Sequence, residues 1–162
     1  MSDPVFSRHP SIDIPEIADY LESVESGECV PCDDQIELAK HIRGVLSNEE
    51  LWINTDKLAK YMSYQRYFPF DLGAWEKFLI ALWLCTYEHD GDGFFPRWPQ
   101  LFLYVGRGSG KNGFISFCSW CLTSKANGIP LYDVDICANT DEQAQTSFLD
   151  VKRILDADAG KW

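Results

Sequence analysis

The feature that most constrains this chain is a glycine-rich run between an apolar segment and a helical pattern. The run Gly106–Lys111 reads Gly-Arg-Gly-Ser-Gly-Lys and directly follows five apolar residues, Leu101–Val105. Such a segment has the length and composition of a parallel strand buried on both faces. Apolar residues then recur at helical spacing from Phe114 to Leu122. The order strand, glycine loop, helix predicts a phosphate-binding loop, in which backbone N–H groups and a helix N-terminus face the phosphates.

Each residue of this loop has an expected task. The backbone of its first five residues would hold the phosphates, and Lys111 would bridge the β- and γ-phosphates of ATP. Arg107 would bring a permanent positive charge to the γ-phosphate. Asn112 stands where Ser or Thr normally holds Mg²⁺, and its amide oxygen can serve as a ligand instead. The predicted phosphate-binding residues are Gly106, Gly108, Ser109, Gly110, Lys111 and Asn112.

The first part of the chain, residues 1–66, is interpreted as a small acidic helical region. Apolar residues at helical spacing predict helices over 15–26, 33–46 and 55–62. Proline at the start of the first helix and acidic or amide residues before the other two are typical helix-starting residues.

The second part, residues 67–162, is interpreted as the first part of a P-loop ATPase domain of the α/β class, with an incomplete parallel sheet as its core. Helices are expected over 71–83, 112–122 and 141–155, and a second strand over 132–138. The expected inward face of the last helix consists of Ala144, Phe148, Val151 and Leu155.

The charge of the chain argues against direct nucleic-acid binding. The 162 residues carry a net charge of −11, and most of the excess acid lies in residues 1–66. An acidic surface repels phosphate backbones, so this chain by itself is a poor candidate for the main nucleic-acid-binding surface. No apolar run approaches the roughly 20 residues that cross a bilayer. We therefore expect a cytoplasmic protein with no membrane partner and with free cysteine thiols.

Four segments, in this order along the chain, resemble the ATPase region of phage terminase large subunits, the motors that package viral DNA. Residues 20–27 are similar to the family's leading helix, and 68–78 to its adenine-side segment. Residues 105–113 resemble its arginine-bearing P-loop, and 138–144 resemble the segment that follows its next strand. The resemblance extends over about residues 16–155.

The resemblance implies an ATPase that couples ATP hydrolysis to translocation of viral DNA into a procapsid in the host cytoplasm. ATP and Mg²⁺ would be its cofactors, and Lys111 and Arg107 its catalytic residues. Trp75 and Glu76 would lie near the adenine, although the family often has glutamine after the tryptophan. The implied partners are the small terminase subunit, the portal protein and double-stranded DNA, all met through a longer protein.

The family also needs an acidic pair at the end of another strand, to hold Mg²⁺ and activate water. No segment here has that pattern, so we expect a truncated chain that binds nucleotide without hydrolysing it. The alternatives are a degenerate P-loop protein that acts as an interaction or assembly module, and another P-loop enzyme such as a helicase-like ATPase or a small kinase.

Two cysteine pairs have the spacing of possible sites. Cys29 and Cys32 could form a redox pair or half of a zinc site, although plain loop cysteines are favoured. Cys118 and Cys121 both fall on the apolar stripe of the helix after the glycine loop, which predicts core packing.

Overall fold

The structure, a computed structural model, describes residues 13–158. These residues divide into two compact units, each made from two stretches of chain. The first unit comprises residues up to Leu58 together with Gly73–Phe102, and the second comprises Ala59–Leu72 together with residues from Leu103 onward.

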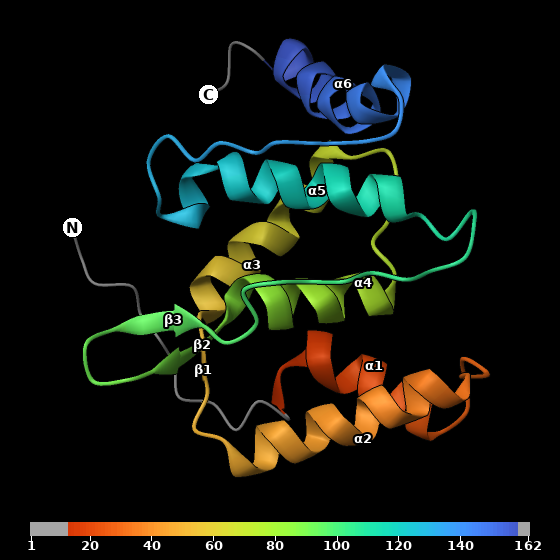
Figure 1. Cartoon of the computed structure of the whole chain (residues 1–162), viewed down its shortest axis with the longest axis vertical. Helices are drawn as coiled ribbons and strands as arrows, with labels where there is room; N and C mark the ends of the chain where they lie inside the picture. The colour runs from red at the N-terminus through yellow and green to blue at the C-terminus, as the bar shows by residue number, and fades with distance from the viewer. Residues whose placement is uncertain (1–12, 159–162) are drawn as a thin grey trace. The chain divides into compact units, whose positions relative to one another are not determined.

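The first unit contains the helices predicted near the N-terminus, α1 (Pro15–Glu25) and α2 (Asp33–Asn48), shown in red and orange in Figure 1. Their apolar stripes are buried as the sequence predicts, apart from Leu38, which is partly exposed. The guanidinium of Arg43 on α2 binds the carboxylate of Glu25 on α1, with Nε 2.6 Å from Oε1. The predicted amphipathic patterns therefore identify both helices and the faces they bury.

A third predicted helix, α3 (Thr55–Ser63), begins after Asn54, whose side chain accepts the backbone N–H of Lys57 at 2.9 Å. The apolar helix expected over 71–83 is present as α4 (Ala74–Leu79), continued by the π-helical turn η3 (Ile80–Leu84). It packs on α1 through the rings of Tyr20 and Phe78, whose centroids are 4.5 Å apart.

The sheet of the first unit is small and antiparallel, and its three strands are ordered β1-β2-β3. Strand β1 is Trp52–Ile53, β2 is Thr86–His89 and β3 is Phe94–Pro96. The sequence interpretation missed this sheet, because short strands joined by a glycine turn lack an extended alternating pattern. Arg97, which directly follows β3, forms a bidentate salt bridge with Glu49. Its Nε lies 2.7 Å from Oε2 and its Nη2 lies 3.0 Å from Oε1.

The second unit is built around α5 (Lys111–Thr123) and α6 (Asp141–Asp158), which pack side by side in Figure 1. This unit also includes the turns η2 (Tyr64–Tyr67) and η4 (Lys125–Asn127) and the segment 128–140, which has no regular secondary structure. Its core consists of Tyr61, Phe114, Phe117, Cys118 and Cys121. The prediction that the Cys118 and Cys121 side chains pack in the core is confirmed.

The structure corrects the prediction of two strands near the glycine loop. Residues 101–105 and 132–138 are extended, but neither belongs to a strand. The side chains of Phe102 and Tyr104 are 90% and 92% exposed, where a central strand would bury them. A strand needs a neighbour to pair its backbone groups, and no segment among residues 13–158 pairs with either one. The class is therefore mixed helix and sheet, and a parallel P-loop core is not found in the described residues.

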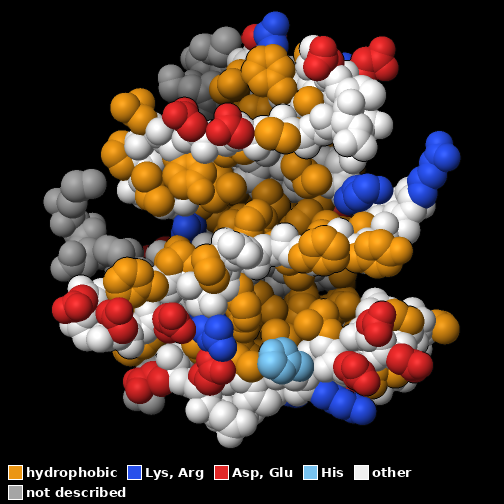
Figure 2. All heavy atoms as spheres, in the orientation of Figure 1, with side chains coloured by type: hydrophobic (Ala, Val, Ile, Leu, Met, Phe, Trp, Pro, Cys, Tyr) orange, Lys and Arg blue, Asp and Glu red, His pale blue; other side chains and the backbone are white. Residues whose placement is uncertain are grey.

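The predicted inward face of α6 is wrong in part: Ala144 and Val151 are half-buried, but the other two residues are not. Phe148 and Leu155 are 60% and 46% exposed, and Ser147 and Ile154 are buried instead. Figure 2 shows apolar side chains among the charged ones on the surface of this helix. In this orientation Asp150 faces α5, where its Oδ2 lies 3.1 Å from Oγ of Ser116. Within the described residues, no helix is long and apolar enough to span a membrane.

The orientation of α6 leads to a stability prediction. Truncating the buried Ile154 to Ala should lower the free energy of unfolding by about 2–4 kcal/mol, because it removes buried methylenes and leaves a cavity. Phe148→Ala removes a larger but mostly exposed side chain and should cost less than about 1 kcal/mol. Urea unfolding followed by circular dichroism measures both. A larger loss for Phe148→Ala would show that α6 buries the face predicted from sequence.

Candidate functional site

The glycine loop before α5 has a backbone that requires glycine at two positions. Gly108 and Gly110 both have φ near +86°, a left-handed conformation that costs other residues roughly 1–2 kcal/mol. The hydroxyl of Ser109 donates to the carbonyl of Gly106 at 2.8 Å and closes the turn between them. The glycine spacing therefore gives the loop its shape, as the sequence predicts.

The loop leads directly into the N-terminus of α5, and no side chain caps that end of the helix. Gly110 is the residue before the helix, and it has no side chain to accept the first N–H groups. The first intrahelical bond runs from the N–H of Phe114 to the carbonyl of Gly110, at 3.0 Å. The backbone donors of Lys111, Asn112 and Gly113 come before that bond and have no acceptor within the helix. This end of the helix thus combines open donors with a positive partial charge.

These donors adjoin an open pocket of about 770 Å³, which lies within the second unit. Its walls come from the glycine loop, the first turns of α5, the extended segment before α6 and the start of α6. The lining residues are Arg107, Gly108, Gly110, Lys111, Asn112, Gly113, Ile115, Ile136, Cys137, Ala138, Gln143, Thr146 and Ser147.

The charge of this pocket is opposite to that of the chain as a whole. Its lining includes two basic side chains, those of Arg107 and Lys111, and no carboxylate. The entire chain, by contrast, has a net charge of −11. Arg107 is exposed and Lys111 is half-buried, so both can reach a ligand at the mouth of the pocket. A pocket of this size with this charge favours an anionic small molecule.

Asn112 is the one predicted metal ligand, and the structure places it at the same pocket with an exposed side chain. No group of three or more His, Cys, Asp or Glu side chains that could hold a metal occurs among residues 13–158. A Mg²⁺ ion fits this donor set only when phosphate oxygens and water supply most of its ligands, as Mg²⁺ commonly prefers. The amide oxygen of Asn112 would then add one protein ligand.

A second pocket of about 440 Å³ adjoins the first one, and Gly113 lines both. Its walls are mostly apolar and aromatic, with one charged pair on α6. The lining residues are Tyr67, Phe68, Pro69, Phe70, Gly113, Asp150, Arg153, Ile154 and Ala157. All of them belong to the second unit.

The ring of Phe70 lies directly on the first turn of α5. A Cβ atom at Gly113 would come to 3.0 Å from the Cζ of Phe70, so a side chain there would require the ring to shift. The side chain of Gln65 holds the same segment from the other side: its Nε2 donates to the carbonyl of Phe70, and its Oε1 accepts the N–H of Leu72 at 2.9 Å. The position of the Phe70 ring is therefore fixed by contacts at its backbone and on its face.

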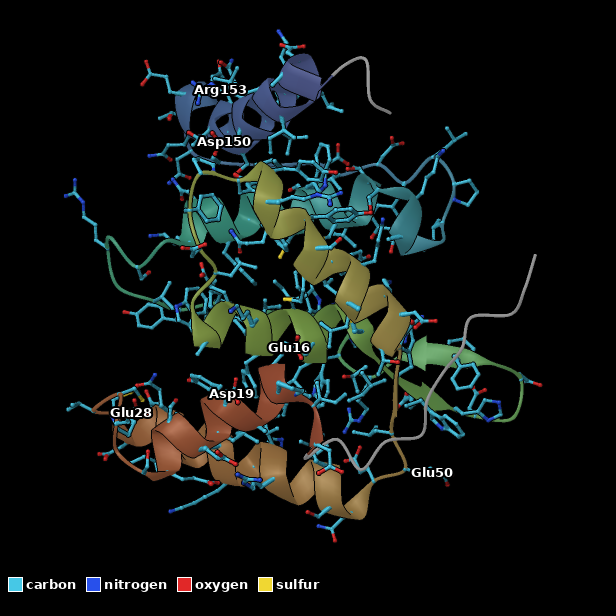
Figure 3. The ribbon with its side chains drawn as sticks, turned by 180° about the vertical axis from the view of Figure 1, so that it is seen from behind. Glu16, Asp19, Glu28, Glu50, Asp150 and Arg153 are labelled. Atoms are coloured by element: carbon cyan, nitrogen blue, oxygen red, sulfur yellow. The ribbon has the colours of Figure 1, made fainter. Side chains whose placement is uncertain are left out.

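The charged pair of the second pocket is arranged along α6, as Figure 3 shows. Asp150 is half-buried and binds both Ser116 on α5 and the Nη1 of Arg153, the latter at 3.3 Å. The side chain of Arg153 is 76% exposed. Asp150 thus joins the two helices, while the guanidinium of Arg153 lies mostly exposed beside it.

Trp75 and Glu76, the predicted adenine contacts, belong to the first unit, and the loop residues belong to the second. Glu76 has a structural task there: its carboxylate is buried and accepts the N–H of Gly73 at 2.7 Å, which caps the start of α4. Burial raises the pKa of Glu76, and the hydrogen bond from Gly73 offsets part of that rise. The carboxylate that the resemblance places near the adenine is thus engaged with the backbone at the start of α4.

Sequence reasoning missed Asp150 and Arg153 as residues of a pocket, and it missed Gln65 as the side chain that binds the backbone around Phe70. Gly113 offered the only local signal, because a glycine within a predicted helix often marks a close approach by another group. The partner in that approach is far away in sequence, so the pattern alone does not identify it.

The raised pKa of Glu76 predicts a pH-dependent difference in stability. The folded protein holds this proton more tightly than the unfolded chain, so the contribution of the carboxyl group is full at low pH and is lost as the pH rises through the folded-state pKa. Glu76→Gln keeps an oxygen acceptor for Gly73 and cannot ionise. Relative to the unmodified protein, the Gln variant should gain stability as the pH rises from about 4 through the folded-state pKa. A stability difference that does not change with pH, measured by urea unfolding, would contradict this.

Comparisons with known proteins identify no relative for this arrangement: no protein-family model matches the chain, and neither do any of the curated proteins or solved structures with which it was compared.

Proposed function

We propose that the chain binds the triphosphate of ATP at the glycine loop, as the nucleotide-binding part of a terminase-like ATPase. The observation that carries the proposal is the pocket at the uncapped N-terminus of α5, with two basic side chains and no carboxylate in its lining. In a chain with a net charge of −11, such a pocket is an unusual local reversal of charge.

Three separate contributions favour phosphate over other anions at this site. The left-handed glycines Gly108 and Gly110 give the loop a concave backbone, and the open end of α5 supplies oriented N–H donors. Lys111 adds a mobile ammonium with three donors, and Arg107 adds a planar guanidinium that can bind two phosphate oxygens at once. A polyphosphate can use all of these groups together, whereas a single carboxylate cannot.

The same residues have clear roles in phosphoryl transfer. Lys111 would neutralise charge on the β- and γ-phosphates, Arg107 would stabilise charge that develops on the γ-phosphate, and Asn112 would position Mg²⁺. A residue that orients the attacking water is also needed, and no carboxylate lines this pocket. In this proposal the chain holds nucleotide in place without supplying that group.

The wider function rests on the sequence resemblance. In the proposed ATPase, residues 101–105 and 132–138 would pair with further strands to complete a parallel P-loop core, whereas within the described residues neither segment pairs with another. The proposed outcome of ATP hydrolysis is translocation of viral DNA into a procapsid in the host cytoplasm. Its partners would be the small terminase subunit, the portal protein and double-stranded DNA.

The proposed site predicts that removing the charge of Lys111 lowers the affinity for phosphate ligands. Lys111→Ala should weaken binding of both Mg²⁺-ATP and inorganic tripolyphosphate by about 10- to 100-fold, because it removes a charge-assisted hydrogen bond worth roughly 1.5–3 kcal/mol. Isothermal titration calorimetry measures both ligands. Lys125→Ala is the matched control: this exposed lysine lies in the same unit and lines neither pocket, so it should leave both affinities unchanged.

Two results would contradict this function. If neither ligand binds at millimolar concentration, the chain is better explained as an interaction or assembly module. If the control variant loses as much affinity as Lys111→Ala, the binding reflects general charge and not the loop.

The missing water-orienting group predicts slow turnover. The purified chain should release inorganic phosphate from Mg²⁺-ATP no faster than its Lys111→Ala variant does, as measured by a coupled phosphate assay. Rapid release that disappears in the Lys111→Ala variant would show that the chain supplies a catalytic group which the pocket's lining does not contain.

A further inference from the structure

The turn that joins α1 to α2 carries two cysteines that the proposed nucleotide site does not use. Cys29 and Cys32 are three positions apart, and both thiols are free and exposed. A second pair with the same spacing, Cys118 and Cys121, is buried in α5. Of the two pairs, the one on the turn is therefore the one that a molecule in solution can reach.

The backbone between the two exposed cysteines is bent. Val30 has a φ of 48°, a left-handed conformation that β-branched residues rarely adopt. Its side chain is 87% exposed, so packing does not impose this conformation. An extended chain of this length would span roughly 10 Å, whereas the Cα atoms of a disulfide lie about 4.4–6.8 Å apart. A left-handed residue turns the chain and so shortens the span toward the range that a disulfide requires.

Hydrogen bonds hold both ends of this turn. The N–H of Cys29 donates to the carbonyl of Ser23 on α1, at 3.4 Å. The N–H of Cys32 donates to Oε1 of Gln35 at 3.0 Å, and Nε2 of the same side chain lies 3.4 Å from the hydroxyl of Tyr20 on α1. Both cysteines are thus anchored to the same helix, and little conformational entropy remains to be lost when their sulfur atoms join.

Negative charge surrounds the two thiols. Glu28 directly precedes Cys29, and Asp33 and Asp34 directly follow Cys32. All three acidic side chains are exposed, and Figure 3 shows Glu28 on the turn between the two helices. None of the three forms an ion pair with a basic side chain among the described residues. Their charge attracts a cationic reagent and repels an anionic one.

A metal ion fits this pair less well than a disulfide does. A structural zinc site needs four ligands, usually Cys and His. No group of three or more His, Cys, Asp or Glu side chains that could hold a metal occurs in the part of the chain that the structure describes. Two copies would have to share the ion, and the acidic side chains beside the thiols oppose the approach of a second copy.

We propose that Cys29 and Cys32 form a thiol–disulfide exchange site for small disulfides that carry positive charge. The thiolate of one cysteine attacks a sulfur of the oxidant, which breaks the oxidant's S–S bond, releases one small thiol and leaves a mixed disulfide on the protein. The second cysteine then attacks the protein sulfur of that mixed disulfide and releases the other half of the oxidant as a second thiol. The protein loses two electrons and two protons, and the oxidant gains both.

The resulting disulfide is reversible and is not a structural brace. It closes a loop of only four residues, 29–32, and the stabilisation that a disulfide gives falls as its loop becomes shorter. Exposed disulfides are also the ones that small thiols most readily reduce again. The pair therefore responds to oxidants and reductants in solution, while α1 and α2 keep their fold in both states.

The test treats the reduced whole chain separately with three disulfides: cationic cystamine, neutral 2-hydroxyethyl disulfide and anionic oxidised glutathione. Intact mass and peptide mapping identify the products. The unmodified protein should form a bond between Cys29 and Cys32 with no lasting adduct on either, whereas Cys29→Ser and Cys32→Ser should each retain half of the oxidant as a mixed disulfide. Cys137→Ser removes an exposed cysteine of the second unit and is the matched control, which should react on the turn as the unmodified protein does.

The charge of the oxidant should set the rate of the reaction. Cystamine should react about 10-fold faster than oxidised glutathione at low ionic strength, and this ratio should fall in about 1 M salt, which screens the carboxylates. A variant that combines Glu28→Gln, Asp33→Asn and Asp34→Asn should lose most of the preference. Equal rates for the two oxidants, or a preference that persists in salt and in this variant, would overturn the assignment of a cationic oxidant.

Two results would overturn the exchange site itself. If each cysteine retains half of the oxidant and no bond forms between them, they are independent loop thiols. If the purified chain instead binds one Zn²⁺ per two chains, and both Cys29→Ser and Cys32→Ser abolish that binding, the pair is half of a shared metal site.

Discussion

The left-handed backbone at Gly108 and Gly110 is the constraint on which the candidate site depends. Because Gly110 is the residue before α5 and has no side chain, it starts the helix without occupying its first N–H groups. The same turn directs the chain so that Arg107 and Lys111 line one pocket. Any residue other than glycine would strain this turn, and an Asp or Ser at position 110 could cap the donors that a phosphate needs.

The helices could be predicted from the sequence because the information that defines them is local. In α1 the stripe of Ile17, Tyr20, Leu21 and Val24 is buried as its spacing predicts. The strands could not be predicted in this way, since a short apolar run such as Leu101–Val105 becomes a strand only beside a partner. The same limit applies to α6, where Ser147 and Ile154 are buried and Phe148 and Leu155 of the apolar stripe are exposed.

In the candidate site, too, the parts that are contiguous in sequence could be predicted, and the parts joined by tertiary packing could not. The glycine loop and its lysine are contiguous in sequence, and their spacing identifies them. The aromatic pocket brings together η2 and the residues after it, the first turn of α5 and the second half of α6, which only tertiary packing can join. Glu76 illustrates a different limit: the resemblance places it near the adenine, and the sequence does not reveal that its buried carboxylate caps α4. Residues that serve the fold and residues that serve a ligand can look identical in sequence.

The most direct test of the central claim is the response of individual backbone amides to inorganic tripolyphosphate, followed in ¹⁵N–¹H correlation spectra of the whole chain. If the open end of α5 binds polyphosphate, the largest shifts will be those of Gly108, Gly110 and residues 111–113, and they will saturate with one binding constant. Shifts that are small at these amides, or that are spread over α1 and α2 without saturation, would contradict the account.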